Sequence, residues 1–328
     1  MNFKIGVCGL PNAGKSSFIK LASSAEVLIG EYPFTTLKSS EYSFFIFSPE
    51  LKTIHEITKT KDVIPDYLIL VDVPGLIKGA HKGEGLGNEF LSYLRSTDVI
   101  LEIVRNFKNQ NVPHPEGNID PLRDILIIEE EIIEAEKEIL ERNLKIIKKR
   151  GEKEKELAME SILKNLKPFK RFPEFSEVLK EYNLLLTKDW YLLINGEEIS
   201  IEDEIKTAFK NIYFIDVKWE IEAKEFEDLP KSFYDFSYKF RKDLNIIQFF
   251  TFTQEITQEW FIKNGATYLE AAYLIHSDFG DKFKEAQVIN LEEFLIFKDW
   301  ELAKKSGKIK IKGKEDKVEE NDIILIKI

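Results

Sequence analysis

The sequence predicts an α/β fold with a phosphate-binding loop near the N-terminus, an inserted α-helical hairpin and a small α+β domain at the C-terminus. Three observations lead to this prediction. A glycine-rich loop lies between an apolar run and a helical pattern, a charge-rich stretch with helical spacing occupies residues 121–166, and short apolar runs fill the chain from about residue 245. The phosphate-binding domain is predicted to consist of residues 1–120 and 181–244. The helical insert is predicted at 121–180 and the C-terminal domain at 245–328.

The bulk composition limits the class of protein. The chain has 328 residues, which favours two or three domains. Apolar residues make up 43% and charged residues 32%, as in soluble globular proteins. The net charge of −11 argues against bulk nucleic-acid binding. No apolar run is long enough for a membrane span, no signal pattern opens the chain, and Cys8 is the single cysteine. We expect a cytoplasmic monomer without disulfides.

The strongest motif is the loop at residues 9–16, with the sequence GLPNAGKS. It matches G-x-x-x-x-G-K-[ST] in full and lies between an expected strand at 3–8 and an expected helix, which argues against a chance glycine-rich turn. Its backbone N–H groups would surround phosphate oxygens, Lys15 would reach the β- and γ-phosphates, and Ser16 would coordinate Mg²⁺. The nucleotide-binding residues predicted here are Asn12, Ala13, Gly14, Lys15, Ser16 and Ser17.

The partners that this loop requires follow in the expected order. Residues 67–71 predict a strand, and Asp72 to Gly75 after it form the pattern D-x-x-G. Asp72 would lie in the second shell of Mg²⁺, and the Gly75 amide would meet the γ-phosphate. Thr36 is the predicted switch threonine, although ordinary strand or turn is the alternative. The glycine-rich stretch 79–87 predicts a second switch, with a flexible linker as the alternative. Together these features predict a P-loop NTPase with a Ras-like G domain.

The catalytic group is less well defined than the phosphate site. Leu76 follows Gly75, where many GTPases hold a glutamine that orients the attacking water. Either hydrolysis is slow or another residue positions the water. His81 and His114 could approach the γ-phosphate, although a structural role is more common for any one histidine. We favour His114, on a proline-flanked loop, beside Lys15 and Gly75 as the catalytic residues.

A polar turn follows the expected strand at 191–194 and lies where GTPases carry Asn-Lys-x-Asp. The aspartate of that motif accepts two hydrogen bonds from guanine. Here the turn reads Asn195, Gly196, Glu197 and Glu198, so the lysine is lost and the carboxylate is one methylene longer. This change predicts adenine acceptance or a loss of discrimination, with Asn195, Gly196 and Glu198 as base-site residues. Residues 216–218 are predicted to supply a third base-site element.

These residues resemble the YchF family of Obg-related P-loop NTPases. The resemblance covers almost the whole chain and rests on the runs GLPNAGKSS, YPFTTL, VDVPGLIKGAHKGEGLGNEFLSYLRSTD, NIDPLRDI, INGEE and the C-terminal QFFTFT to SGKIKIKG. It implies ATP preferred over GTP, a helical insert, a C-terminal TGS domain and association with ribosomes. It also implies family roles for Lys15, Ser16, Thr36, Asp72, Gly75, Asn195 and Glu198, a hydrophobic residue at Leu76 and a histidine-bearing loop at His114.

The chain departs from the family pattern in its length, at one P-loop residue and at the start of its C-terminal domain. It is shorter around the helical insert and at 219–240, and Ser17 stands where threonine is commoner. The C-terminal domain lacks the usual Gly-Pro after its first strand. These differences concern the partner surface more than the nucleotide site.

The middle and the end of the chain carry weaker signals. Ile125, Ile128, Ile132, Ala135 and Ile139 form a short heptad seam up to Arg142, and Gly151 marks the turn of the hairpin. The hairpin is either a partner-binding arm or a solvated spacer. The segment 245–328 has one expected helix at 267–275. Its 12 lysines against 15 acidic residues make a direct RNA clamp unexpected. A capped turn explains His276 to Asp278 better than catalysis.

Two classes of function therefore remain open. The first is a Mg²⁺-dependent ATPase, able to bind ATP and possibly GTP, that hydrolyses nucleotide slowly as a switch at the ribosome. The second is an adaptor that binds nucleotide without hydrolysis, or else a GTP-specific Obg-like GTPase. Leu76 favours the adaptor, whereas the complete set of Mg²⁺-shell residues favours the ATPase.

Overall fold

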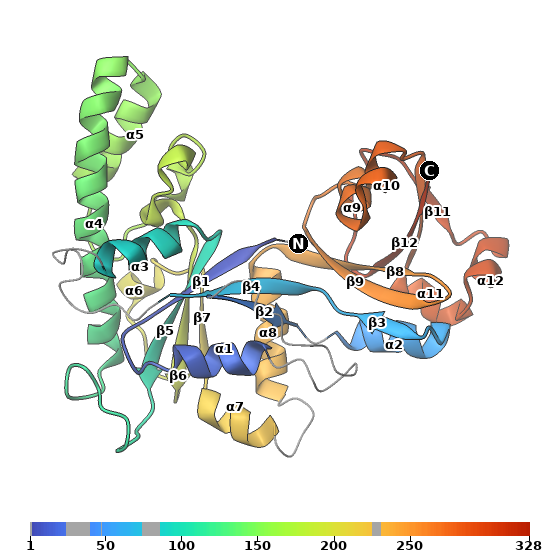
Figure 1. The fold of residues 1–328 in the computed structure, drawn as a ribbon, viewed down its shortest axis with the longest axis horizontal. Coiled ribbons are helices and arrows are strands. Elements are labelled where there is room, and N and C mark those ends of the chain that lie inside the picture. The colour runs from blue at the N-terminus through green and yellow to red at the C-terminus, as the bar shows by residue number, and fades with distance from the viewer. Residues whose placement is uncertain (1, 24–39, 47, 74–85, 225–230) are drawn as a thin grey trace.

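The structure is a computed structural model that describes residues 2–23, 40–46, 48–73, 86–224 and 231–328. Its described residues form two six-stranded sheets, placed side by side along the long axis of the molecule (Figure 1). The helical hairpin projects from the side of the first sheet that faces away from the second sheet. The predicted α/β class, with inserted helices and a C-terminal α+β domain, is confirmed.

The first sheet has the strand order β2-β4-β1-β5-β6-β7 and is parallel except for β2. Its strands are β1 (Lys4–Cys8), β2 (Glu41–Phe45), β4 (Tyr67–Asp72), β5 (Val99–Asn106), β6 (Trp190–Gly196) and β7 (Asn211–Ile215). Apolar cores cover both faces of this sheet, as a parallel sheet requires. The carboxyl ends of the parallel strands meet at one edge, where ligands of such sheets bind.

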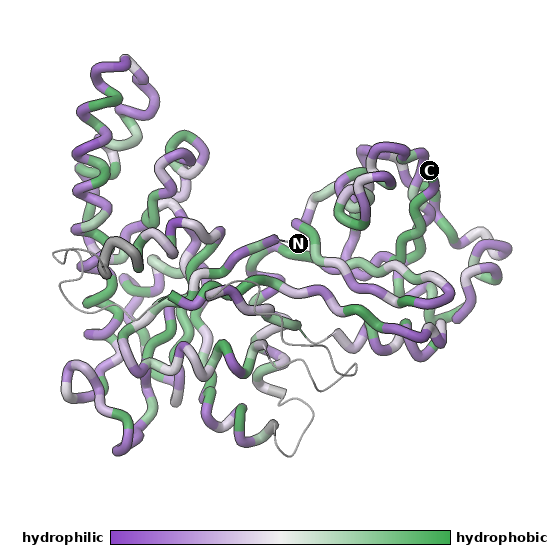
Figure 2. Tube along the Cα trace, in the orientation of Figure 1, coloured by the Kyte–Doolittle hydropathy of each residue, from purple (hydrophilic) through white to green (hydrophobic). Residues whose placement is uncertain are grey.

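Helices pack on both faces of the first sheet. They are α1 (Lys15–Ser23), α3 (Leu86–Arg95), α6 (Asp203–Lys206), α7 (Val217–Lys224) and α8 (Lys231–Asp243). Phenylalanines of α8 close one face by packing against Phe18 and Phe44, with ring centroids 5.8–6.5 Å apart. The hydrophobic strands inside both sheets stand out against the polar helix surfaces (Figure 2).

The hairpin consists of α4 (Pro121–Arg150) and α5 (Lys153–Lys164). Asp120 caps α4 by accepting a hydrogen bond from the Arg123 N–H, and Gly151 ends it in the left-handed conformation at φ 72°. The predicted seam continues beyond Arg142, since Ile147 is fully buried against α5. Short 3₁₀ turns at Pro173–Phe175, Lys180–Tyr182 and Leu185–Thr187 then lead back to β6.

The second sheet has the order β11-β10-β12-β8-β9-β3. Its strands are β8 (Ile246–Phe252), β9 (Ile256–Lys263), β10 (Glu285–Asn290), β11 (Lys310–Lys312), β12 (Asp322–Lys327) and β3 (Asp62–Ile64). Its helices are α9 (Tyr268–Ile275), α10 (Ser277–Asp281), α11 (Leu291–Phe297) and α12 (Trp300–Lys305), so the sequence-based expectation of one helix here was wrong. The runs that form α10 to α12 are 5 to 7 residues long, too short for a clear periodicity. His276 caps α10 by accepting the Asp278 N–H, as the capped-turn prediction required.

The sixth strand of this sheet comes from the N-terminal part of the chain. Residues 49–64 leave the first sheet as α2 (Pro49–Thr58) and β3, and β3 pairs in parallel with β9. Leu51, Ile54 and Val63 pack against the core of the C-terminal domain. The predicted domain limits assigned this segment to the nucleotide-binding domain alone, and the structure corrects that assignment.

None of the helices in the described ranges combines the length and the apolar character that a membrane span requires.

Candidate nucleotide-binding site

A cavity of about 400 Å³ opens at the carboxyl edge of the first sheet. The P-loop, the loop after β5, the end of β6 and the start of α7 form its wall. The lining residues are Asn12, Gly14, Lys15, Ser16, Ser17, Phe107, Asn109, Val112, Asn195, Val217, Lys218, Ile221 and Glu222. Most of the predicted P-loop residues therefore meet the predicted base-site elements in one place.

The backbone of the P-loop needs its glycines. Gly14 has φ +100°, and a Cβ there would lie 2.2 Å from Asn195 Nδ2. Gly9 has φ +149°, and its Cβ would lie 2.2 Å from the Ile103 carbonyl oxygen. An L side chain is strained at such φ values and has no room at these distances. The motif glycines thus bring the loop against β5 and β6.

Lys15 lies at the base of the P-loop. Its Nζ donates hydrogen bonds to the carbonyl oxygens of Gly9, at 3.0 Å, and Leu10, at 3.1 Å. Burial lowers the pKa of Lys15, while the nearby Cys8 and Asp72 side chains act in the opposite direction. The ammonium group is therefore held at the loop by neutral acceptors, which a phosphate can replace.

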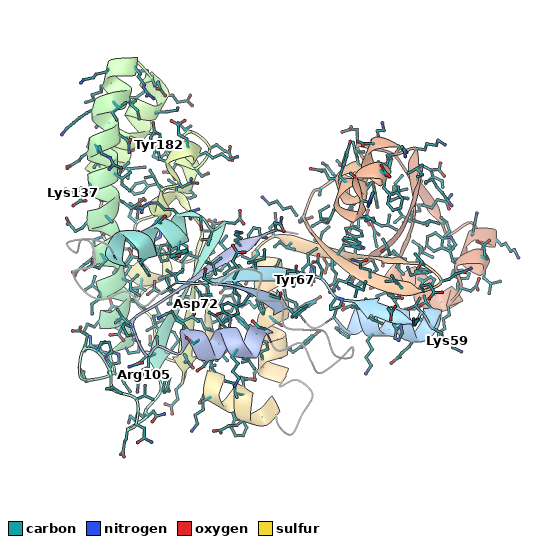
Figure 3. The ribbon with its side chains drawn as sticks, viewed as in Figure 1. Lys59, Tyr67, Asp72, Arg105, Lys137 and Tyr182 are labelled. Atoms are coloured by element: carbon teal, nitrogen blue, oxygen red, sulfur yellow. The ribbon has the colours of Figure 1, made fainter. Side chains whose placement is uncertain are left out.

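Asp72 ends β4 beside the P-loop (Figure 3). The register pairs it with Val7 of β1, two residues before the loop begins. Burial raises the pKa of its carboxyl group, and the Lys15 charge opposes that rise. The strand register therefore places Asp72 close to the start of the P-loop, and its role at the Mg²⁺ ion stays a prediction.

Asn195 connects three parts of the wall. Its Nδ2 donates to the Ala13 carbonyl oxygen at 2.9 Å, and its Oδ1 accepts the Val217 N–H at 3.1 Å. The side chain belongs to a residue that is only 3% exposed, so both amide groups are satisfied inside the protein. Asn195 therefore fixes the P-loop against β6 and α7. Ala13 contributes its carbonyl to this contact and is itself buried.

The rest of the predicted base-reading turn does not line the cavity. Gly196 has φ +130°, and a Cβ there would lie 2.3 Å from the Asn106 carbonyl oxygen. Asn106 Nδ2 also donates to the Glu197 carbonyl at 2.7 Å, which fixes the turn. Glu198 is exposed and is absent from the described cavity wall. Val217 and Lys218 of the third predicted element do line the cavity.

Arg105, which the sequence reasoning missed, organises the loop after β5. Its guanidinium donates to the carbonyls of Phe107 at 3.2 Å, Val112 at 3.0 Å, and Asn109 and Pro113 at 3.4 Å each. It also lies 4.5 Å from the centroid of the Phe107 ring. The residue is 2% exposed. The signal in the sequence was an arginine directly after the mostly apolar run at residues 99–104.

The same loop is tied to the P-loop. Asn12 Nδ2 donates to the Pro113 carbonyl oxygen at 2.9 Å, and Asn12 itself has φ +63°, which asparagine tolerates. Because Phe107, Asn109 and Val112 line the cavity, the position of this loop decides the shape of the wall.

His114 lies on this loop but outside the cavity wall. Its Nε2 lies 2.8 Å from Asp124 Oδ2, and its Nδ1 accepts the Glu116 N–H at 3.1 Å. Asp124 also accepts a hydrogen bond from Arg123 at 2.9 Å. The imidazole side chain is 4% exposed. Both ring nitrogens are engaged, so a catalytic role, which stays a prediction, requires these bonds to break.

Several predicted residues lie outside the described part of the chain, namely Thr36, Gly75, Leu76 and His81. For Mg²⁺, the described residues supply a hydroxyl at Ser16 and a carboxylate at Asp72. They contain no group of three or more His, Cys, Asp or Glu side chains arranged to hold a metal. A hydroxyl ligand with a carboxylate in the second shell fits Mg²⁺, which takes few protein ligands and completes its shell with water and phosphate oxygens.

Comparison with known proteins identifies the family. The chain is 32% identical to the ribosome-binding ATPase YchF of Haemophilus influenzae, over 99% of this chain and 98% of that protein. It is 33% identical to Obg-like ATPase 1 of Saccharomyces cerevisiae, over 98% and 93%. The chain belongs to the YchF and Obg-like ATPase family.

Two further comparisons agree with this membership. Residues 4–150 match a family model described as 50S ribosome-binding GTPase, and residues 246–328 match the YchF GTPase C-terminal model, described as a protein of unknown function. The solved structure of the Schizosaccharomyces pombe YchF GTPase superposes with a TM-score of 0.82 at 27% identity, over 99% of this chain and 98% of that one. The family predicted from the sequence is thus confirmed.

Proposed function

We propose that this protein is a Mg²⁺-dependent P-loop ATPase that acts as a slow nucleotide-dependent switch in the cytoplasm. The observation that supports this proposal best is that the P-loop, Asn195 and the start of α7 line one shared cavity. Lys15 would exchange its two carbonyl acceptors for the β- and γ-phosphate oxygens. Ser16 would coordinate Mg²⁺, and Asp72 would lie in its second shell. When bound, the ion would neutralise charge on the phosphates.

The preference for ATP over GTP follows from the base end of the cavity. A guanine-specific site needs a carboxylate that accepts from both N1–H and the N2 amine. At the equivalent turn the chain carries Glu198, which is exposed and outside the wall. The lining carboxylate Glu222 is instead paired with Lys218 at 3.5 Å. Adenine is therefore the base that leaves fewest polar groups unpaired.

Ribosomes are the proposed partner. The support is the family membership, since the Haemophilus influenzae relative is named a ribosome-binding ATPase and the model for residues 4–150 is described as a 50S ribosome-binding GTPase. The protein would act as a monomer whose nucleotide state alters its affinity for the ribosome.

Calorimetric titration of nucleotide-free protein with Mg·ATP, and separately with Mg·GTP, tests the base preference. Tighter binding of ATP is expected, and a clear preference for GTP would identify an Obg-like GTPase instead. Phosphate release above the no-enzyme blank, abolished in Lys15→Ala, is expected for an ATPase.

A non-hydrolysing adaptor is the second candidate, and one observation favours it. The imidazole of His114 is engaged by Asp124 and Glu116, so it is not free to position water in this conformation. ATP binding without phosphate release would support this alternative. Unchanged turnover in His114→Ala would remove the histidine from the mechanism while leaving the ATPase assignment intact.

A further inference from the structure

The two sheets of the molecule are joined by packed side chains as well as by the chain itself. Ile246 of β8 and Phe261 of β9 belong to the second sheet, but they lie in the apolar core of the first domain with Phe240 of α8. In the opposite direction, Leu51 and Ile54 of α2 lie in the core of the second domain. We call the boundary between these two cores the domain junction.

Glu259 lies at the domain junction. It is on β9, two residues before Phe261, and its cross-strand partner on β8 is Phe250. Because side chains alternate along a strand, Glu259 shares one face of the sheet with both phenylalanines. Phe261 belongs to the core of the first domain and Phe250 to the core of the second. The glutamate is 1% exposed, so a carboxyl group is enclosed where the two cores meet.

This carboxyl group has few polar partners. Its Oε2 accepts the Asp66 N–H at 3.3 Å. Its Oε1 accepts no hydrogen bond of ordinary geometry from the residues that the structure describes. Among those residues, no lysine, arginine or histidine nitrogen forms an ion pair with Glu259. An ionised carboxylate in such surroundings is costly, whereas the neutral acid is tolerated.

Asp66 lies between β3 and β4, where the chain passes from one sheet to the other (Figure 1). Its carboxyl group accepts the N–H groups of Phe261, at 2.7 Å, and of Tyr67, at 2.8 Å. These bonds connect the start of β4 to β9. The negative charge of Asp66 disfavours the ionisation of Glu259.

Arg241 of α8 is fully buried beside the domain junction, but it does not pair with Glu259. Its guanidinium donates to the Ile246 carbonyl oxygen at 3.0 Å and pairs with Glu320 at 2.7 Å. Its charge favours the ionised form of Glu259 without a direct contact. Arg241 therefore compensates the charge of Glu320 rather than that of Glu259.

The segment that contains α2 brings further polar groups to the domain junction. The Ser48 hydroxyl favours the ionised form of Glu259, but it also donates to Glu50 at 3.4 Å. His55 faces β9 through Thr60, whose hydroxyl lies 3.0 Å from the His55 Nδ1. Histidine changes charge near neutral pH, so its contribution must be separated from that of Glu259 by experiment.

The two strands beside β9 add no charge on the face that carries Glu259. β8 contains no charged residue. Asp62 of β3 pairs with Ile256, whose side chain lies on the opposite face of β9. In the described ranges, the charged neighbours of Glu259 are therefore Asp66 and Arg241. Glu50, Glu320 and His55 reach it only through other side chains.

The pH dependence of the domain junction follows from the state of this carboxyl group. Burial raises the pKa of Glu259 to about 8, whereas the ordinary pKa of a glutamate is 4.5. Between these two values, a closed junction holds a proton that an open, hydrated junction releases, so a rise in pH favours opening. Above about pH 8 the carboxyl group is ionised in both forms, and the pH dependence ends.

Two other buried glutamates show what distinguishes Glu259. In the first domain, Glu136 pairs with Arg95 at 2.6 Å, and Glu129 pairs with Arg171. An arginine compensates each of these charges, so both can stay ionised inside the protein. Glu259 has no such counter-ion among the described residues, and it lies at a boundary between two cores rather than within one.

We infer that the domain junction is a pH-sensitive lock centred on Glu259. The junction closes over the protonated carboxyl group. When it opens, water enters between the two cores and takes the proton, so the open form becomes more favourable as the pH rises. Because Glu259 lies at the boundary of both cores, parting them hydrates the carboxylate while each domain stays folded.

Hydrogen exchange measured by mass spectrometry tests the inference on the nucleotide-free full chain. Wild type and Glu259→Gln are compared at the same pH, so the intrinsic exchange rate cancels. In peptides from β3, β8 and β9, the ratio of wild-type to variant exchange rates should rise at least about tenfold between pH 6 and pH 8. The ratio should level off above about pH 8. The variant keeps His55 and Asp66, so a pH dependence caused by either group would remain in it.

Glu102→Gln is the matched control. Glu102 is also fully buried, its carboxyl oxygens accept no hydrogen bond in the described part of the chain, and burial raises its pKa. It lies on β5 inside the first sheet, away from the domain junction. The wild-type pH dependence of the junction peptides should therefore persist in this variant. Glu259→Met, which has a similar length and cannot ionise, gives the same test if Glu259→Gln does not fold.

Two results would overturn the inference. The first is an equal pH dependence of exchange in wild type and in Glu259→Gln. The second is a wild-type increase that is as large in β1 and β5 as in the junction peptides, since that result would describe unfolding of the whole chain. Neither result bears on the proposed ATPase activity, because no nucleotide takes part in the measurement.

Discussion

The phosphate end and the base end of the cavity are built in different ways. At the phosphate end, Lys15 bonds to Gly9 and Leu10, six and five residues away in the chain. At the base end, Asn195 bonds to Ala13, 182 residues away, and Asn12 bonds to Pro113, 101 residues away. One short motif thus specifies the first end, whereas the second depends on how β1, β5 and β6 align.

This difference should appear in the effects of substitutions. Changes at the phosphate end should remove chemistry and leave the fold intact. Changes at the base end should alter affinity and stability together, because the same side chains hold the loops and shape the cavity.

Lys15→Ala should have the largest effect on turnover. Loss of the ammonium group should reduce ATP hydrolysis by at least about 100-fold, since its charge is needed where phosphate charge develops. The unfolding temperature should change little, because the group removed is a buried cation with a lowered pKa and neutral carbonyl partners. Phosphate release and thermal unfolding measure the two effects. A variant that keeps a tenth of wild-type turnover would contradict the assignment of the phosphate end.

Gly14→Ala should disrupt the junction between the two ends. The new Cβ would lie 2.2 Å from Asn195 Nδ2, at a backbone φ of +100°. We expect a loss of about 1–3 kcal/mol in unfolding free energy, with weaker ATP binding.

Gly117→Ala is the matched control for Gly14→Ala. Gly117 has φ +81°, but nothing lies within 4 Å of the added Cβ. This variant isolates the backbone strain from the contact with Asn195. Equal losses of stability and ATP affinity in the two variants would show that the Asn195 contact has no part in the effect.

Arg105→Lys should act on binding rather than on chemistry. Lysine cannot donate the hydrogen bonds that the Arg105 guanidinium makes to four backbone carbonyls. The loop that carries Phe107 and Val112 should therefore be held less firmly. We expect KM for ATP to rise about three- to tenfold with kcat nearly unchanged, which is the signature of lost ground-state binding. Steady-state kinetics measure the split.

The double variant Asn12→Ala, Arg105→Lys tests whether Arg105 acts on ATP binding through its contact with the P-loop. Both side chains hold the carbonyl of Pro113, so their effects on binding should not add. Additive effects in the double variant would separate Arg105 from the P-loop contact and confine its role to the stability of the loop itself.

Glu198→Gln should have the smallest effect. Because Glu198 is exposed and outside the cavity wall, ATP affinity should change by less than about threefold, as for most surface substitutions. Calorimetry with Mg·ATP measures it. A tenfold loss would show that the turn moves into the cavity when nucleotide binds.

The sequence by itself determined the features that depend on local spacing. The P-loop between β1 and α1, Asp72 at the end of β4, and the hairpin with Gly151 at its turn were all predictable. The position of each feature depends on a glycine that permits a positive φ, or on the spacing of apolar residues within one helix or strand.

Tertiary structure alone decided the features that depend on distant partners. β3 has only three residues and gives no periodic signal, yet it completes the second sheet by pairing with β9, which follows almost 200 residues later. Arg105 acquires its role from a loop that folds back over it. His114 is engaged by Asp124, and Glu198 is exposed outside the cavity wall, next to Glu197, whose carbonyl Asn106 holds. A sequence pattern shows which side chains are present, but the strand register and the loop contacts determine which of these side chains contact one another.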